Sequence, residues 1–138
     1  MLAPEYGGDG GKAVGACAGK PPPVAAFPAH WAPNDLKIYT GRAFPAAYQG
    51  GAFIAVHGSW NRAPAPQGGF NVVFQPLKDG RASGDWVVFA DGFAGKSPLM
   101  QPNDAVSRAD GVAQGPDGSL FIAESQKGKV WRVMYKGQ

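Results

Sequence analysis

The segment 53–62 carries the side chains best suited to chemistry in this sequence. An apolar run, 52–56, leads directly into His57, Trp60, Asn61 and Arg62. Their imidazole, indole N–H, amide and guanidinium groups can all hydrogen bond to carboxylates or carbonyls on a ligand. Rigid strands often present such side chains on the loop that follows them. The alternative is structural, with Trp60 capping the strand, His57 packed and Arg62 facing water.

Two further positions offer related chemistry. Arg108 lies just ahead of the short apolar run 111–113, and a guanidinium can hold a carboxylate through two parallel hydrogen bonds. His30 and Trp31 lie in an Ala/Pro-containing turn, where an aromatic ring could stack on a flat ligand. A surface arginine and a purely structural turn remain the alternatives for these positions.

Several other chemistries find no support in the sequence. The aspartates at 35, 104, 110 and 117 are isolated, so no metal ligands and no catalytic residues are assigned. The glycine-rich stretch 7–12 lacks the spacing of a phosphate-binding loop, and Ser59 lacks the context of a hydrolase nucleophile. The single cysteine, Cys17, excludes an intrachain disulfide and a zinc ribbon.

Charge and hydropathy exclude further classes of function. The net charge is only +3 and the 13 Lys and Arg residues are scattered, so a nucleic-acid partner is not expected. No apolar run is long enough to span a membrane. The first residues have neither a basic start nor an apolar core, so no signal peptide is expected in this chain.

The composition predicts an all-β protein with many turns. The chain contains 21 Gly and 13 Pro, and its apolar residues fall in short runs rich in Val, Ile and Phe. The runs expected to form strands are 36–39, 52–56, 70–77, 86–89, 111–113, 120–123 and 130–135. Residues 1–34, which include three consecutive prolines, are expected to form an irregular loop or linker.

An internal repeat organises these strands. Phe53-Ile54-Ala55 recurs as Phe121-Ile122-Ala123, and another strand follows each copy. The first copy has a long insertion before that next strand, whereas the second has a short turn. Four antiparallel strands followed by three more fit one whole β-propeller blade and most of a second. Residues 35–138 are therefore predicted to form propeller blades.

The sequence resembles the sorbosone dehydrogenase family, which is related to the soluble sugar dehydrogenases that use pyrroloquinoline quinone (PQQ). The resemblance covers roughly residues 24–135. Its motifs are His30-Trp31-Ala32-Pro33, Phe44-Pro45 with Tyr48 and Gly50, His57-Gly58-Ser59-Trp60-Asn61-Arg62, Gly115-Pro116-Asp117-Gly118-Ser119-Leu120 and Trp131-Arg132-Val133.

This resemblance implies a six-bladed propeller that binds PQQ and calcium, of which this chain would be the C-terminal two blades. It further implies a sugar or aldehyde substrate, the remaining blades as partners, and a periplasmic or secreted location. The catalytic histidine base would lie in earlier blades, so the chain alone would be inactive. The cofactor contacts expected here are His30, Trp31, His57, Trp60, Asn61, Arg62 and Arg108.

The sequence leaves open how the cofactor is held near Gly58, and whether the function is catalysis or binding. The glucose-oxidising relatives have a cofactor-binding lysine near the position of Gly58. A non-catalytic propeller module used for binding is the alternative function, since it would keep the strands and turns without needing the polar loop 57–62.

Overall fold

The computed structural model describes residues 18–137, and it is all-β with antiparallel sheets and almost no helix. The first sheet has the strand order β1-β2-β3-β6. Its strands are β1 (Pro33–Ile38), β2 (Ala52–Val56), β3 (Asn71–Gln75) and β6 (Val87–Ala90). A small hairpin of β4 (Leu77–Lys78) and β5 (Arg81–Ala82) is inserted between β3 and β6.

The second sheet contains three strands in sequence order: β7 (Ala109–Gln114), β8 (Leu120–Glu124) and β9 (Val130–Val133). Two single-turn 3-10 helices, η3 (Ala46–Tyr48) and η4 (Pro102–Asp104), lie in the connections. The all-β prediction is confirmed. The irregular segment expected at residues 1–34 lies partly outside the described residues, at 1–17, and residues 18–32 contain no helix or strand.

The burial of each strand follows its sequence pattern. β2 and β3 are buried along their whole length because both faces of the first sheet are covered. β8 instead alternates between buried and more exposed residues, which is typical of a sheet with one covered face. The pairs Phe53↔Phe74 and Ile54↔Val73 place two apolar layers on opposite sides of the first sheet.

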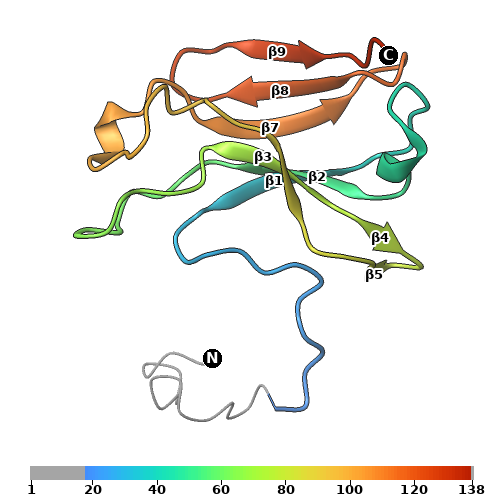
Figure 1. The fold of residues 1–138 in the computed structure, drawn as a ribbon, viewed down its shortest axis with the longest axis horizontal. Coiled ribbons are helices and arrows are strands. Elements are labelled where there is room, and N and C mark those ends of the chain that lie inside the picture. The colour runs from blue at the N-terminus through green and yellow to red at the C-terminus, as the bar shows by residue number, and fades with distance from the viewer. Residues whose placement is uncertain (1–17, 138) are drawn as a thin grey trace.

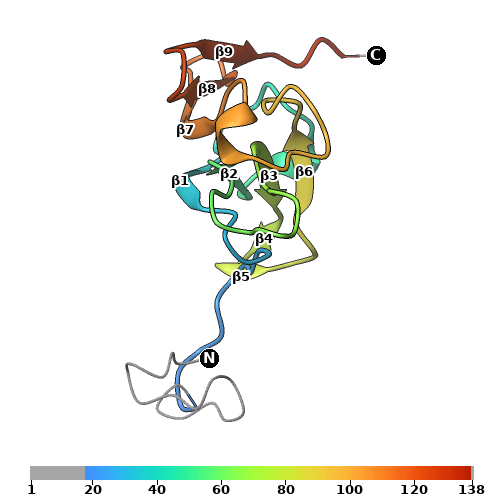
Figure 2. The same ribbon diagram turned by 90° about the vertical axis from the view of Figure 1, so that its left-hand side faces the viewer.

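The two sheets meet along their first strands, and the distance between them increases toward their last strands. Figure 2 shows β7 above β1, with β6 and β9 far apart at the outer ends of the two sheets. Polar side chains join the two inner strands: the Asp35 carboxylate accepts the Val112 N–H at 2.9 Å, and Asn34 Nδ2 donates to Asp110 Oδ1 at 2.6 Å. These bonds fix the two sheets relative to each other. Figure 1 shows the first strands, β1 and β7, at the place where the two sheets meet.

Aromatic side chains fill the wedge between the diverging sheets. Tyr39, Phe44, Phe53 and Phe74 are buried there, together with Leu120 and Ile122 from the second sheet. The Tyr39 hydroxyl donates to the Gly118 carbonyl at 2.8 Å and accepts the Phe44 N–H at 3.0 Å. The wedge therefore contains a continuous core. The buried Tyr39 hydroxyl within it both donates and accepts a hydrogen bond.

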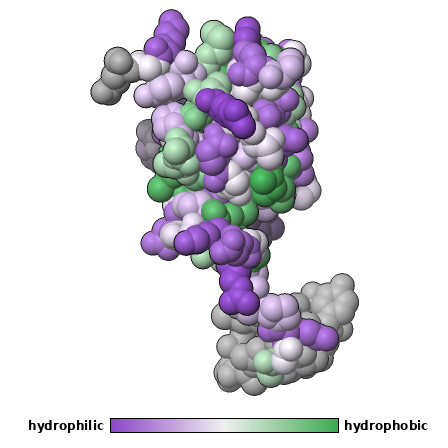
Figure 3. Space-filling model, turned by 90° about the vertical axis from the view of Figure 1, so that its right-hand side faces the viewer, coloured by the Kyte–Doolittle hydropathy of each residue, from purple (hydrophilic) through white to green (hydrophobic). Residues whose placement is uncertain are grey.

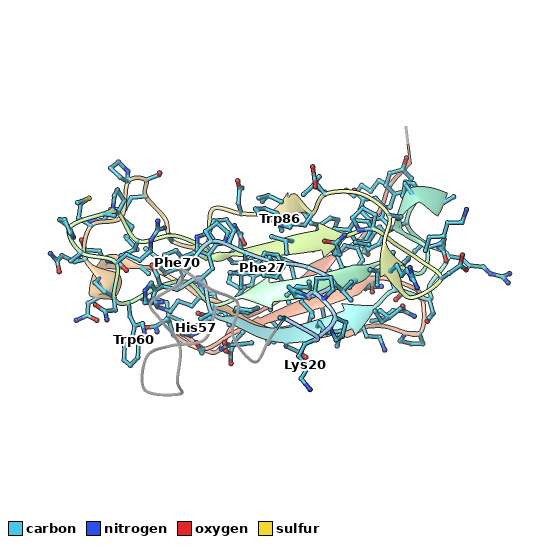
Figure 4. The ribbon with its side chains drawn as sticks, turned by 90° about the horizontal axis from the view of Figure 1, so that it is seen from below. Lys20, Phe27, His57, Trp60, Phe70 and Trp86 are labelled. Carbon is cyan, nitrogen blue, oxygen red and sulfur yellow. The ribbon has the colours of Figure 1, made fainter. Side chains whose placement is uncertain are left out.

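A second, smaller core lies on the opposite side of the first sheet. Ala52, Ile54, Val56 and Val73 are buried there beneath Phe27, Trp31, Leu77 and Trp86. Trp86 contacts both Phe27 and Trp31, with ring centroids 5.5 Å apart in each pair. The segment before β1 therefore covers part of the first sheet (Figure 4).

The repeat seen in the sequence is a repeat of structure. β2 and β8 are equivalent second strands of their sheets, and β1 and β7 are equivalent first strands that each contain a register shift near the start. Asn34 and Asp110 occupy that shift in the two sheets, and they hydrogen bond to each other. The two sheets therefore contact each other through equivalent positions.

Candidate functional site

An open pocket of about 580 Å³ lies where the connection after β2 meets the approach to β7. It brings together three of the predicted site residues, His57, Trp60 and Arg108. The other lining residues are Ala32, Gly58, Pro102, Asn103 and Gln126. In Figure 4, His57 and Trp60 lie at the same end of the molecule, with Phe70 nearby. A larger cavity of about 610 Å³ near Phe93 and Trp131 is mostly apolar and contains none of the predicted site residues.

The loop that carries His57 and Trp60 is held by backbone pairing on both sides. The N–H groups of His57 and Gly58 donate to the carbonyls of Ala32 and Trp31, each at 2.9 Å. Ser59 is fully buried, and its hydroxyl donates to Gln67 Oε1 and accepts the Gly68 N–H, both at 2.8 Å. Ser59 therefore has a structural role in closing the base of the loop.

Arg108 anchors the same loop from the second sheet. Its side chain is only 6% exposed, and Nη1 donates to the carbonyls of His57, Gly58 and Ser59 at 3.1–3.4 Å. Nη2 donates to the Pro102 carbonyl at 2.8 Å. The guanidinium also stacks on the Phe70 ring, 4.7 Å from its centroid. The cation thus ties residues 57–59 to the η4 segment.

The charge of Arg108 is not neutralised by a carboxylate. Among residues 18–137, the ion pairs are Lys96–Asp104 and Arg132–Asp117, and neither involves Arg108. Burial lowers the pKa of the guanidinium from its ordinary value, because its charged form is poorly solvated. A buried cation that faces a pocket is stabilised by an anion placed in that pocket. The pocket therefore suits an anionic ligand.

His57 is half-buried beside this cation. Its Nε2 lies 2.9 Å from the hydroxyl oxygen of Ser125. Burial lowers the pKa of His57, and the positive charge of Arg108 lowers it further, whereas Asp110 acts in the opposite direction. The imidazole is therefore neutral at neutral pH and can donate through one nitrogen while it accepts through the other.

The remaining pocket residues supply an aromatic face and amide groups. The Trp60 side chain is 79% exposed, so its indole is available to a ligand. Asn103 and Gln126 add amides, which can donate or accept hydrogen bonds. The turn that carries Ser125 and Gln126 is itself fixed by the buried Glu124 carboxylate, which accepts the N–H groups of Gln126, Lys127 and Lys129.

The other predicted site residues lie away from the pocket lining. The Trp31 ring packs against Trp86 on the far side of the first sheet, and its buried Nε1 has no hydrogen-bond partner within the described part of the chain, residues 18–137. A side chain at Gly68 would collide with this nitrogen and with Nη1 of Arg62. His30 and Asn61 are exposed and do not line the pocket. Cofactor contact by each of these residues stays a prediction.

Three pocket-side residues were not singled out from the sequence: Ser125, Asn103 and Gln126. The repeat could have predicted that Ser125 lies near His57. Ser125 stands 68 positions after His57, at the equivalent end of the repeated strand. Nothing in the local sequence of Asn103 indicates that η4 lies beside the loop after β2. That proximity is created by the hydrogen bond from Arg108 to Pro102.

Within residues 18–137, no group of three or more His, Cys, Asp or Glu side chains is arranged to hold a metal ion. The same part of the chain has no helix that is long and apolar enough to span a membrane.

Comparison with known proteins identifies the family. The chain is 32% identical over 117 residues to an uncharacterized protein of Borreliella burgdorferi, in a match that covers 83% of this chain and 29% of the relative. The chain thus spans less than a third of the length of this relative. No solved structure matches significantly. The model of the TrAA12-like family matches residues 11–136. The chain therefore belongs to the TrAA12-like family, whose members are sorbosone dehydrogenase-like and related to the PQQ-dependent sugar dehydrogenases.

Proposed function

We propose that this chain is the C-terminal part of a PQQ-dependent sugar or aldehyde dehydrogenase of the sorbosone type. The observation that carries the proposal is the pocket in which a buried guanidinium, which has no carboxylate partner among residues 18–137, lies beside a neutral imidazole. Membership of the TrAA12-like family supports the choice of PQQ as the ligand. PQQ is flat and carries several carboxylates and carbonyls, so its chemistry matches these groups.

The arrangement of the sheets supports a propeller as the complete fold. Propeller blades are antiparallel sheets that radiate from a central axis, with the first strand of each blade innermost. The two sheets of this chain meet at β1 and β7 and diverge outward, as such blades would (Figure 2). We therefore propose that they are two of six blades, and that the remaining blades complete the substrate pocket.

The residues of this chain would bind and orient the cofactor. Bound PQQ accepts two electrons from the substrate as hydride. Arg108 would attract a carboxylate, and the protein bonds of its two terminal nitrogens leave Nε free to donate. Trp60 would offer an apolar face that excludes water, while Asn103 and Gln126 would donate to ligand oxygens.

The base that removes the substrate proton is proposed to lie outside this chain, which would make the chain inactive alone. Calcium, which the sugar dehydrogenases use together with PQQ, is part of the same proposal, with no ligand assigned to residues 18–137. We also propose a periplasmic or secreted location for the whole protein, as for its dehydrogenase relatives.

PQQ titration with calcium present tests the cofactor assignment. We expect saturable quenching of tryptophan fluorescence, because Trp60 is exposed beside the pocket. Arg108→Lys should weaken binding at least tenfold, since lysine cannot reproduce the planar donor set. Lys78→Ala, which removes an exposed cation from β4, is the matched control and should change nothing. If neither this chain nor its full-length version binds PQQ, the assignment fails.

Substrate turnover separates this proposal from its alternative, a non-catalytic propeller module that serves in binding. Full-length protein loaded with PQQ and calcium should reduce an artificial electron acceptor when supplied with aldoses or sugar aldehydes. Binding of PQQ without turnover of any sugar or aldehyde would favour the binding module.

A further inference from the structure

The side chains of His57 and Ser125 meet beside the candidate pocket, at the end of the molecule where Figure 4 labels His57. Each residue directly follows the second strand of its sheet. Nε2 of His57 lies 2.9 Å from the Ser125 hydroxyl oxygen, which is the distance of a hydrogen bond. A neutral imidazole has one N–H and one bare nitrogen, so the direction of this bond decides which ring nitrogen carries the proton.

The Gly58 backbone indicates the direction of that hydrogen bond. Burial and then Arg108 lower the pKa of His57, whereas Asp110 and a hydrogen bond to the backbone of Gly58 raise it. A backbone group that favours the protonated ring is a carbonyl, which accepts from a ring N–H. Because Nε2 faces Ser125, the nitrogen at the Gly58 carbonyl is Nδ1. The single proton of the neutral ring therefore lies on Nδ1, and Nε2 accepts from the Ser125 hydroxyl.

The charged groups around this imidazole keep it neutral without holding Nε2. Arg108, which directly precedes β7, disfavours a second proton on the ring, and the Asp110 carboxylate in β7 has a weaker effect in the opposite direction. The pocket residues from η4 and from the turn after β8, Asn103 and Gln126, are uncharged. The hydrogen bond to Nε2 is thus supplied by the Ser125 hydroxyl.

The backbone of Ser125 is fixed on both sides. Its N–H donates to the Arg108 carbonyl at 3.3 Å. The turn that follows is held by the buried Glu124 carboxylate, which accepts the N–H groups of Gln126 and Lys127 at 3.0 and 2.7 Å. The hydroxyl is therefore presented to Nε2 from a preorganised turn, so little conformational entropy is lost when the bond forms.

The hydrogen bonds continue from His57 to the buried cation. The Gly58 carbonyl also accepts Nη1 of Arg108 at 3.1 Å, the shortest of the three bonds from this nitrogen. Arg108 joins both ends of the chain of bonds, because its carbonyl holds Ser125 and its guanidinium holds the backbone of the His57 loop. Ser125, His57, Gly58 and Arg108 therefore form a closed circuit of hydrogen bonds in the pocket wall.

We propose that Ser125 is a positioning residue of the candidate site: its hydroxyl donates to Nε2 of His57 and fixes the imidazole as the tautomer with its proton on Nδ1. The ring then supports the Gly58 carbonyl, and with it the orientation of Arg108. Nε of Arg108 and the amide of Gln126 remain as donors to an anionic ligand. This inference rests on the proposed function only where PQQ is named as that ligand.

Nitrogen NMR of the ligand-free chain tests the tautomer directly. At about pH 8, where the imidazole is neutral, long-range proton–nitrogen correlation spectra distinguish the protonated ring nitrogen from the bare one. The chain has only 2 histidines, so His30→Gln identifies the His57 signals. We expect a proton on Nδ1 in the wild type, both tautomers in Ser125→Ala, and the wild-type pattern in Ser125→Thr, which keeps the hydroxyl. A wild-type proton on Nε2, or an unchanged pattern in Ser125→Ala, overturns the proposal.

PQQ titration tests whether Ser125 acts through His57. Ser125→Ala should weaken binding roughly threefold to tenfold, as expected for the loss of one hydrogen bond, and Ser125→Thr should retain wild-type affinity. In a His57→Ala background, Ser125→Ala should cause no further loss. Losses that add independently would show that Ser125 contacts the ligand itself, which contradicts a positioning role.

Ser83→Ala is the matched control, because it also removes the hydroxyl of an exposed serine. Ser83 follows the hairpin β4–β5, which projects at the end of the molecule opposite to the loop after β2 (Figure 1). Figure 3 shows the molecule from that opposite end, where hydrophilic and hydrophobic residues are interspersed on the surface. The control should leave both the tautomer of His57 and the affinity for PQQ unchanged.

The two measurements separate this inference from the proposed function, once circular dichroism has shown that each variant folds. If the NMR results hold and no variant binds PQQ, the proposed function fails and the positioning role stands. If PQQ binds but Ser125→Ala leaves the tautomer unchanged, the positioning role fails and the proposed function stands.

Discussion

The two sheets share their strands and differ in their connections. β2 of the first sheet is followed by the long loop 57–70, whereas β8 of the second sheet is followed by the short turn 125–129. The long loop exposes backbone carbonyls to the interior, and the cation of Arg108 binds them. The short turn points its N–H groups inward, and the anion of Glu124 binds them.

This difference shows how a repeated fold acquires a site at one position. The loop and the turn meet where His57 contacts Ser125, which are equivalent residues of the two repeats. If both connections were short, Trp60 and its neighbours would not exist and no pocket wall would form. The asymmetry between the connections, rather than any change in the strands, creates the candidate site.

The largest loss of stability should come from Arg108→Met, which removes the cation that holds the long loop. Hydrogen bonds from a charged group contribute about 1.5–3 kcal/mol each, and buried carbonyls left without donors add a penalty. We expect the free energy of unfolding to fall by about 3 kcal/mol in urea titrations, a loss typical of a broken buried network. Arg42→Met, at an exposed arginine, should change it by less than about 0.5 kcal/mol. Equal effects of the two substitutions would contradict the anchoring role.

A smaller and more local loss of stability should follow Glu124→Gln, which removes the anion that holds the short turn. Hydrogen bonds from the N–H groups of Lys129, Gln126 and Lys127 outweigh burial and lower the pKa of Glu124. The neutral amide keeps the shape but loses the charge, so the turn should be less protected in amide hydrogen exchange. Residues 57–59 should keep their protection. Equal loss of protection in both connections would show that they are not held independently.

The contact between the two connections should respond to pH. The pKa of His57 is lowered in the folded protein, chiefly by burial and then by Arg108, so below pH 6.5 the unfolded chain binds the proton more readily. Stability should therefore be lost as the pH falls below 6.5 and through the lower pKa of the folded state. His57→Gln should flatten this dependence between about pH 7 and pH 5. NMR titration of the ring protons should report a pKa below 6.5 in the wild type, and a value at or above it would contradict the mechanism.

The smallest effect on stability should come from a substitution of Asp117, in the exposed turn between β7 and β8. Hydrogen bonds from the Ser119 side chain, and next from Arg132, lower the pKa of Asp117 to about 2. Its contribution is complete above the ordinary value of 3.8 and is lost as the pH falls toward about 2. Asp117→Asn should remove this small contribution at every pH above the ordinary value and so flatten the acid limb of the stability profile. A change at neutral pH comparable to that of Glu124→Gln would contradict the ranking.

Much of the fold could be predicted from the sequence because the strands carry local signals. The run 52–56 corresponds to β2, and the Phe-Ile-Ala repeat located β8. The hairpin β4–β5 was not predicted, since two-residue strands have no detectable periodicity. Closure of a full propeller would require sheets in addition to these two, so it stays a prediction.

The site could be predicted only in part because long-range contacts build it. His57, Trp60 and Arg108 were named from residue type and resemblance, and the structure places them around one pocket. Trp31 carries the same aromatic signal, yet it packs under the first sheet because Trp86 lies there to receive it. Partners far away in the sequence decide which of the two tryptophans lines the pocket, and local patterns do not reveal those partners.

The packing around Gly58 restricts the order in which this site can change during evolution. Gly58 has a φ of 94°, and a side chain there would collide with the Phe70 ring on which Arg108 stacks. A lysine at position 58 therefore requires an earlier reduction of Phe70. That first step would remove the support of Arg108. The two ways of placing a positive charge here are thus separated by a destabilised intermediate, so lineages are expected to retain one or the other.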